Sequence, residues 1–182
     1  MKTNKNQVRI IAGAWRGRFV IFPALVDLRP TSNRVRETLF NWLGSSISGM
    51  TCLDLFAGSG ALGFEAASRG AGEVVLVDRN SSVCKSLNIS ADRLCARQVE
   101  IHRSEALDFC TSDTRRFDLV FLDPPFEMDF HDKLWSGIEN KLKPGSLLYF
   151  ESNRQEELPG CYTKQRKSKA GNVIYTLLEY RP

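Results

Sequence analysis

The chain has 182 residues, of which 42% are hydrophobic and 25% are charged, and its net charge is +4. This length suits one main domain, and the composition is that of an ordinary globular protein. The longest apolar runs are too short to cross a bilayer and the N-terminus has no signal-peptide pattern, so we expect a cytoplasmic protein.

The N-terminal segment is predicted to be a small basic extension. Short β-type runs at 8–12 and 18–22 flank a glycine-containing turn, which is typical of a hairpin. Residues 1–36 carry eight basic side chains and a single acid, a net charge of +7, whereas the remainder of the chain has a net charge of −3. We therefore expect residues 1–30 to form an extension that meets an anionic partner, and residues 31–182 to form the main domain.

A helix is predicted next. Hydrophobic residues recur at helical spacing between Val35 and Leu43. Ser32 can cap the N-terminus of this helix, and Gly44 is expected to mark its end.

After Gly49 the pattern alternates between strands and helices. Strand-like runs lie at 51–56, 73–77, 98–102, 117–122 and 146–151, and helical stretches lie at about 60–69, 81–96, 104–111 and 129–142. Two final β-type runs, 161–167 and 172–180, are joined by the turn signal 168–171. This order predicts an α/β fold with a mostly parallel sheet that ends in an antiparallel hairpin.

The first turn of the α/β region carries a glycine motif. Gly58, Gly60 and Gly63 form G-x-G-x-x-G between a predicted strand and a predicted helix. Such glycines permit a tight turn, close approach of a ligand and close packing of the helix on the strand. Asp78 follows the next strand, where an acid typically accepts hydrogen bonds from ribose hydroxyls. Asp54 would repel a pyrophosphate but suits a cation, such as the amino group of S-adenosylmethionine (SAM).

The stretch Asp54-Leu55-Phe56-Ala57-Gly58-Ser59-Gly60 resembles motif I of the class I SAM-dependent methyltransferases. The cofactor contacts that follow from this resemblance and from the spacing are those of Asp54, Phe56, Ala57, Gly58, Gly60 and Asp78. Further candidates for the same cofactor are Arg79, Glu105, Ala106 and Thr31. Each of these has an ordinary alternative, since they can also start, cap or pack a helix.

The tetrapeptide Asp123-Pro124-Pro125-Phe126 follows the strand-like run 117–122, at the edge where open α/β sheets bind ligands. An exocyclic amine of a nucleobase is a poor nucleophile. The Asp123 carboxylate and the Pro124 carbonyl can accept its two N–H bonds and direct its lone pair toward a methyl group. Pro124 and Pro125 stiffen the loop, and Phe126 can stack on a base that has left its helix. The alternative is a rigid proline turn.

This tetrapeptide resembles motif IV of the methyltransferases that modify adenine N6, cytosine N4 or guanine N2. Residues 9–18 and 29–43 resemble the N-terminal signature of the RsmD family, bacterial enzymes that methylate a guanine N2 in 16S ribosomal RNA. The resemblance extends from about Val8 to Tyr180. It implies a seven-stranded sheet with a reversed last strand, a flipped guanine at residues 123–126 and a monomeric enzyme. It also implies a substrate in the small ribosomal subunit or its assembly intermediate. We expect direct transfer of the methyl group, without a metal.

Basic side chains near both hairpins are predicted to hold this RNA. Basic groups neutralise phosphates, and an aromatic ring can stack on an unpaired base. The candidates are Trp15, Arg16, Arg18, Arg34, Lys164, Arg166 and Lys167. For Trp15 the alternative is a buried packing role.

Three other functions fit parts of the sequence. A DNA adenine N6 methyltransferase would share both motifs but needs a separate target-recognition region. A nicotinamide-dependent dehydrogenase would use the glycine motif and leave residues 123–126 unexplained. A non-catalytic RNA-binding protein would have no affinity for SAM. Five cysteines and two histidines lack the spacing of a zinc site, so we expect no metal.

Overall fold

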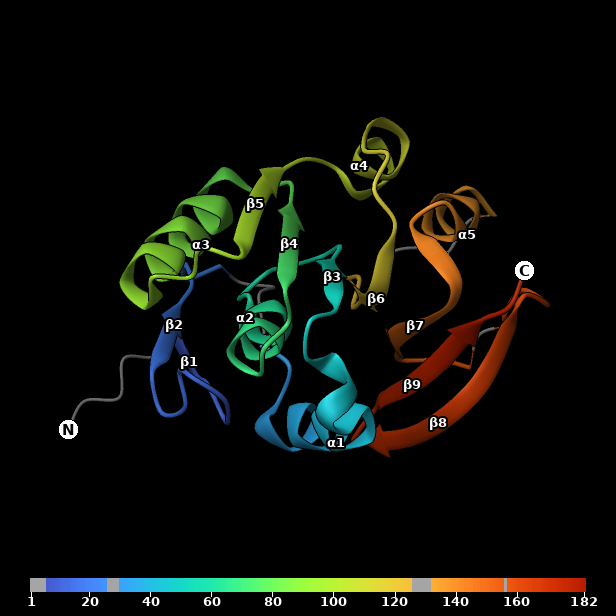
Figure 1. Ribbon diagram of the computed structural model, residues 1–182, viewed down its shortest axis with the longest axis horizontal. Coiled ribbons are helices and arrows are strands. Elements are labelled where there is room, and N and C mark those ends of the chain that lie inside the picture. The colour runs from blue at the N-terminus through green and yellow to red at the C-terminus, as the bar shows by residue number, and fades with distance from the viewer. Residues whose placement is uncertain (1–5, 26–29, 126–131, 156) are drawn as a thin grey trace.

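The computed structural model describes residues 6–25, 30–125, 132–155 and 157–182, and it contains two β-sheets with helices beside them (Figure 1). The strands are β1 (Gln7–Arg9), β2 (Phe19–Ile21), β3 (Thr51–Asp54), β4 (Glu73–Asp78), β5 (Val99–Arg103), β6 (Phe117–Leu122), β7 (Leu142–Ser152), β8 (Tyr162–Ala170) and β9 (Val173–Tyr180). The helices are α1 (Asn33–Leu43), the 3-10 helix η1 (Gly44–Ile47), α2 (Ala61–Ser68), α3 (Ser81–Leu94), α4 (Ala106–Ser112) and α5 (Asp132–Glu139).

The sheet topology confirms the predicted fold class. Within the described residues the larger sheet has seven strands in the order β5-β4-β3-β6-β7-β9-β8. Strands β3 to β7 pair in parallel, whereas β9 is antiparallel to both β7 and β8. β9 is therefore the reversed last strand, and β1 and β2 form the predicted N-terminal hairpin.

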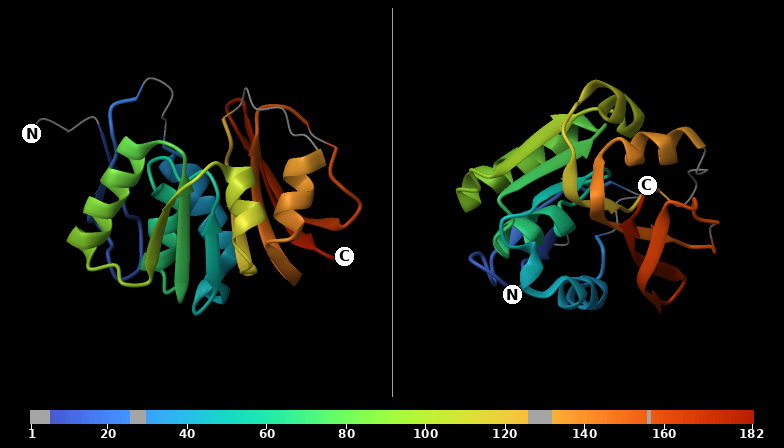
Figure 2. Two further views of the ribbon diagram at one scale, coloured as in Figure 1. Left: turned by 90° about the horizontal axis from the view of Figure 1, so that it is seen from above. Right: turned by 45° about the vertical axis from the view of Figure 1, so that its right-hand side comes forward.

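Helices cover both faces of the large sheet (Figure 2). Cys52, Leu119 and Phe121 point into a hydrophobic cluster that includes side chains of α1, α2 and α3. Leu53 and Val120 point to the opposite face, into a cluster with α4 and α5. Because the central strands are buried on both faces, they are nearly continuous hydrophobic runs. None of the described helices is long and apolar enough to cross a membrane.

The carboxylate of Glu65 in α2 is the centre of a buried polar cluster. It accepts hydrogen bonds from the backbone amides of Ile11 (2.8 Å) and Ala12 (3.0 Å). The guanidinium of Arg36 in α1 lies 3.3 Å from the same carboxylate, and both side chains are fully buried. Arg36 also donates to the carbonyl of Arg9 at 2.9 Å. Since a buried charge is tolerated only where it is paired and hydrogen-bonded, these contacts fix the N-terminal segment, α1 and α2 in one arrangement.

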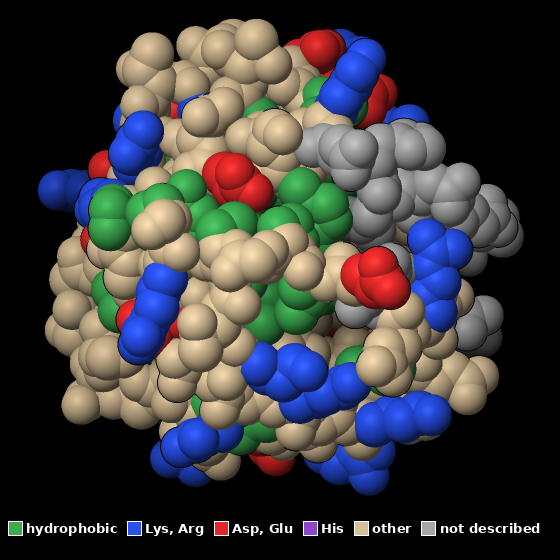
Figure 3. Space-filling model, turned by 90° about the vertical axis from the view of Figure 1, so that its right-hand side faces the viewer, with side chains coloured by type: hydrophobic (Ala, Val, Ile, Leu, Met, Phe, Trp, Pro, Cys, Tyr) green, Lys and Arg blue, Asp and Glu red, His purple; other side chains and the backbone are tan. Residues whose placement is uncertain are grey.

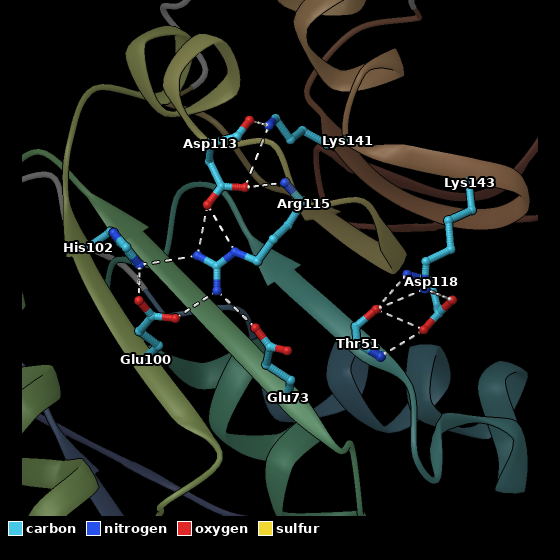
Figure 4. A network of polar contacts seen from close by, with 9 residues as sticks. All are labelled: Thr51, Glu73, Glu100, His102, Asp113, Arg115, Asp118, Lys141 and Lys143. Carbon is cyan, nitrogen blue, oxygen red and sulfur yellow. Dashed lines mark hydrogen bonds and ion pairs between the residues drawn. The ribbon is translucent and has the colours of Figure 1, made fainter.

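A second polar network lies near the amino ends of the strands (Figure 4). Arg115 pairs with Glu100 at 2.7 Å, and Lys143 pairs with Asp118 at 2.6 Å. The hydrogen bond from Arg115 lowers the pKa of Glu100. Burial alone would raise the pKa of Asp118, but hydrogen bonds from Lys143 and Thr51 outweigh it and lower that pKa. The acids of this network are therefore matched by cations.

Some predicted boundaries are corrected. The helix expected over 129–142 ends at Glu139, and Leu142 already belongs to β7. A proline follows Lys143, and the residue before proline disfavours helix. The turn of the last hairpin was expected at 168–171. β8 continues to Ala170, so the turn begins at Gly171, which has a positive φ of 61°.

The buried ion pair generates a stability prediction. Glu65→Ala leaves Arg36 as an uncompensated buried charge and leaves two backbone amides without an acceptor. We expect a loss of about 3–5 kcal/mol in the free energy of unfolding. Urea denaturation measures it. Glu73→Ala, which removes an exposed ion pair with Arg115, is the control and should cost at most about 1 kcal/mol. Equal losses in the two variants would contradict the assigned role of Glu65.

Candidate active site

The glycine turn connects β3 to α2 at the carboxyl edge of the sheet. Gly60 has a positive φ of 74°, and a Cβ there would lie 2.7 Å from side-chain atoms of Leu87 and Phe64. A Cβ on Gly63 would lie 2.1 Å from Leu76, so this position permits the close approach of α2 to β4. The glycine motif therefore has the backbone geometry that the sequence predicted for Gly60 and Gly63.

Two acids accept hydrogen bonds from backbone amides of the glycine motif. Asp54 accepts a hydrogen bond from the amide of Gly63 at 3.1 Å. Asp78 accepts from the amides of Gly58 (3.0 Å) and Asn80 (2.8 Å). Burial raises the pKa of Asp54 to about 7, with a further contribution from the charge of Asp123. Burial also raises the pKa of Asp78, although these amide hydrogen bonds oppose the shift.

Asp123 follows β6 at the same edge. Its Oδ2 accepts a hydrogen bond from the hydroxyl of Thr31 at 3.2 Å, so the segment before α1 reaches over the predicted catalytic loop. Burial raises the pKa of Asp123 to about 6. Pro124 is buried and Pro125 is exposed. Phe126, the last member of the tetrapeptide, lies outside the described residues.

Sequence reasoning missed two side chains beside Asp123. Glu151, near the end of β7, is 4% exposed, and the hydroxyl of Tyr149 donates to its Oε1 at 2.7 Å. Burial raises the pKa of Glu151 to about 8, with further contributions from the charges of Asp123 and Asp54. The available signal was a lone acid that ends the apolar run 147–150.

These acids make the carboxyl edge electrostatically unlike the amino edge. Among the described residues, Asp54, Asp78, Asp123 and Glu151 make no ion pair with a lysine or arginine. Their pKa values are raised, whereas those of Glu100 and Asp118 at the opposite edge are lowered. Carboxyl groups without cations of their own suit a cationic ligand, and SAM carries both a sulfonium and an ammonium group. The described residues contain no cluster suited to a metal ion.

The remaining predicted cofactor contacts lie around the same edge. Arg79 and Glu105, which follow β4 and β5, form an exposed ion pair at 3.7 Å. Ala106 begins α4, and the residue before it, Glu105, is the N-cap rather than Ser104. Ala57 is buried and its amide donates to the carbonyl of Val77 at 2.8 Å, while Phe56 is half-buried.

The structure separates the two groups of predicted RNA-binding residues. The turn of the first hairpin is bonded to Ser68, the last residue of α2, because the amides of Ala14 and Trp15 donate to that serine. α2 begins at the glycine turn and runs back to the amino edge, so Ser68 and the hairpin turn that carries Arg16 and Arg18 lie toward that edge, away from Asp123. The Trp15 side chain is 9% exposed and packs in the core, which favours the packing alternative for this residue.

The second group lies nearer the site. β8 runs parallel to β7, so its end and the turn at Gly171 reach the carboxyl edge. Lys164, Arg166 and Lys167 are exposed on β8, and Arg34 is exposed on α1. Lys164 and Lys167 line a shallow hollow together with Arg154, Thr176 and neighbouring side chains. Figure 3 shows Lys and Arg side chains gathered in the lower part of the face on which β8 and β9 lie.

The raised pKa of Asp54 generates a prediction for the cofactor-free protein. Its carboxyl holds a proton in the folded state at pH values where the unfolded chain, with a pKa of about 4, has lost it. Its contribution to the free energy of unfolding therefore falls as pH rises from about 4 to about 7, by at most about 1.4 kcal/mol per pH unit. Urea denaturation from pH 5 to pH 7 should show a flatter profile for Asp54→Asn than for the wild type. A steeper decline in the variant would contradict this assignment.

Comparisons with known proteins agree with this geometry. The model of the family described as "Conserved hypothetical protein 95" matches residues 8–179. The ribosomal RNA small subunit methyltransferase D of Haemophilus influenzae is 40% identical over 183 residues, covering 96% of this chain and 95% of that protein. The protein of the same name from Escherichia coli K12 is 38% identical over 182 residues, covering 97% of this chain and 92% of that protein.

A solved structure shares the whole fold. The putative methyltransferase from Escherichia coli superimposes with a TM-score of 0.87 at 38% identity, covering 96% of this chain and 98% of that one. The fold is that of the SAM-dependent methyltransferases, and the expected resemblance to the RsmD family is confirmed. With a family model that spans almost the whole chain and relatives of similar length, the protein belongs to the conserved hypothetical protein 95 family.

Proposed function

We propose that this protein transfers a methyl group from SAM to the exocyclic N2 of a specific guanine in 16S ribosomal RNA. The observation that carries the proposal is the position of Asp123, beside a glycine turn and among acids that form no ion pair with a lysine or arginine of the described residues. The names of the relatives support a substrate in the small ribosomal subunit, and the sequence signature at residues 9–18 and 29–43 supports guanine N2. The protein acts as a monomer on that subunit or its assembly intermediate.

The acids and glycines of the carboxyl edge hold the cofactor. When bound, SAM supplies a methyl group on a positively charged sulfur. Asp78 accepts hydrogen bonds from its ribose hydroxyls, and Asp54 faces its ammonium group. Gly58 and Gly60 allow the backbone to approach the ligand, because they have no side chain at the turn. Arg79, Glu105 and Ala106 flank the adenine ring, beside the turn residues Phe56 and Ala57.

Asp123 and the carbonyl of Pro124 orient the substrate amine. Each accepts one N–H bond, which directs the nitrogen lone pair at the methyl group and stabilises the positive charge that develops on the nitrogen. Asp123 then accepts the proton that the methylated amine loses. Pro125 stiffens the loop, and Phe126 stacks on the flipped guanine. Thr31 positions Asp123 through its hydroxyl.

The exposed cations hold the RNA around this site. Residues 31–182 form the methyltransferase domain, and residues 1–30 are its basic extension. Lys164, Arg166 and Lys167 lie on the strand that ends at the edge of Asp123, so they contact phosphates near the target base. Arg34, near the start of α1 and three residues after Thr31, also lies on the side of the site. Arg16 and Arg18 contact RNA farther from it, which requires a substrate large enough to reach from one edge of the sheet to the other.

Two substitutions separate catalysis from cofactor binding. Asp123→Ala should change the affinity for SAM far less than methyl transfer, which should fall by about 10²–10³-fold because the amine loses a charged acceptor. Asp78→Ala should weaken SAM binding by about 10–100-fold, because a hydrogen bond to a charged group is lost. Calorimetric titration with SAM and a tritiated-methyl assay on small ribosomal subunits measure the two effects. Wild-type turnover of Asp123→Ala would contradict the assignment, and mass mapping of the methylated nucleotide identifies the target base.

A second pair of variants tests the RNA contacts. Lys164→Ala/Lys167→Ala should weaken binding to the small-subunit particle and reduce the slope of its salt dependence by about 1–2. Arg16→Ala/Arg18→Ala removes the same charge at the opposite edge and should have a smaller effect on affinity. Filter binding at several salt concentrations gives both slopes. An unchanged slope in both double variants would contradict the proposed RNA contacts.

A further inference from the structure

Asp123 and Glu151 occupy equivalent positions on neighbouring strands. The parallel register of β6 and β7 ends with Leu122 beside Phe150, and Asp123 and Glu151 are the next residues along the two strands. The charge of Asp123 acts on Glu151, as expected for two groups that lie close together. Side chains alternate along a strand, which puts both carboxyl groups on the face covered by α1 and α2, as for the pair Phe121 and Tyr149 two residues earlier. Neighbouring strands are about 4.8 Å apart, so the two acids are direct neighbours.

The surroundings of this pair discourage two full negative charges. Tyr149 is fully buried and donates to Glu151, while Thr31 donates to Asp123. Among the described residues, the other titratable groups that act on them are Asp54 from β3 and, through Tyr149, Tyr175 from β9. Both are acids, so neither offsets a negative charge. Two like charges in a buried site favour a state in which one proton is shared.

We propose that Asp123 and Glu151 share one proton in the cofactor-free protein, release it when SAM binds, and regain one from the substrate amine after methyl transfer. Glu151 is in this view a positioning residue that acts through Asp123. The shared proton and its release rest on the fold and its cofactor, and the recovery of a proton from the substrate amine rests on the proposed function.

The charges balance through the cycle. The pair with one proton carries −1. Release of that proton leaves −2, facing the positive sulfur of SAM. Methyl transfer breaks the sulfur–carbon bond and forms the nitrogen–carbon bond, which moves the positive charge from sulfur to nitrogen. One N–H bond of the methylated amine then breaks and its proton passes to Asp123, so the pair again carries −1 beside a neutral thioether.

The test compares SAM with its demethylated product, S-adenosylhomocysteine. Both ligands carry the same amino, carboxylate and adenosine groups, so contacts of Asp54 and Asp78 cancel in the difference. Calorimetric titration in buffers with different heats of ionisation counts the protons released. At pH 7 we expect SAM to release up to one proton more than the product does. The affinity for SAM should accordingly rise with pH relative to that for the product, by at most tenfold per pH unit, between about pH 6 and pH 8.

Substitutions assign the proton to this pair. Glu151→Gln should abolish the difference in proton release between SAM and its product. It should also lower kcat more than it raises KM. Tyr149→Phe removes the hydrogen bond that favours ionised Glu151, so the pH range in which the two ligands differ in proton release should move upward. Glu37→Gln, at an exposed position on α1, is the matched control and should keep the wild-type difference.

Several outcomes would overturn the proposal. Equal proton release for SAM and its product in the wild type would do so, as would an unchanged difference in Glu151→Gln. Should Glu151→Gln fail to fold, the wild-type comparison and Tyr149→Phe still decide. No RNA is present in these titrations. Equal proton release together with methylation of guanine N2 would contradict the shared proton alone. The expected proton release without methylation of guanine N2 would contradict the proposed function alone.

Discussion

The buried carboxylate of Glu65 holds together the parts of the molecule on which the site depends. It binds the backbone of the N-terminal segment at Ile11 and Ala12, and it pairs with Arg36 of α1. α2, which carries Glu65, begins at the glycine turn, and α1 begins two residues after Thr31. The contacts of this one buried carboxylate therefore position both the helix that begins at the glycine turn and the segment that reaches Asp123.

Acidic side chains have opposite surroundings at the two edges of the sheet. At the amino edge the acids are paired with Arg115, Lys141 and Lys143, and the pairs join neighbouring elements. At the carboxyl edge the acids Asp54, Asp123 and Glu151 accept hydrogen bonds from hydroxyl and amide groups, and no lysine or arginine among the described residues pairs with them. The first arrangement stabilises the fold, and in the second the carboxyl groups ionise more readily when a cationic ligand lies beside them. Perturbed carboxyl groups gathered in this way are typical of functional sites.

Much of the fold and part of the site were predictable because their signals are local. The glycine turn and the tetrapeptide at Asp123 follow strands and Asp78 ends one, and the carboxyl ends of parallel strands meet at one edge. Glu151 was not predictable in the same way. Its importance comes from the register between β6 and β7 and from the burial of its carboxyl group, and neither is encoded in the residues next to it.

The basic residues show the same division. The sequence by itself determined that positive charge is concentrated in the first 36 residues, that strands and helices alternate, and that the motif residues follow strands. Only the tertiary structure decided that the turn bearing Arg16 lies toward the amino edge, whereas the end of β8 lies at the edge of Asp123. It also buried Trp15 in the core and brought Thr31 to Asp123. The physical reason is that composition and spacing are properties of neighbours along the chain, while distances between elements depend on how hydrophobic faces and buried charges pack across it.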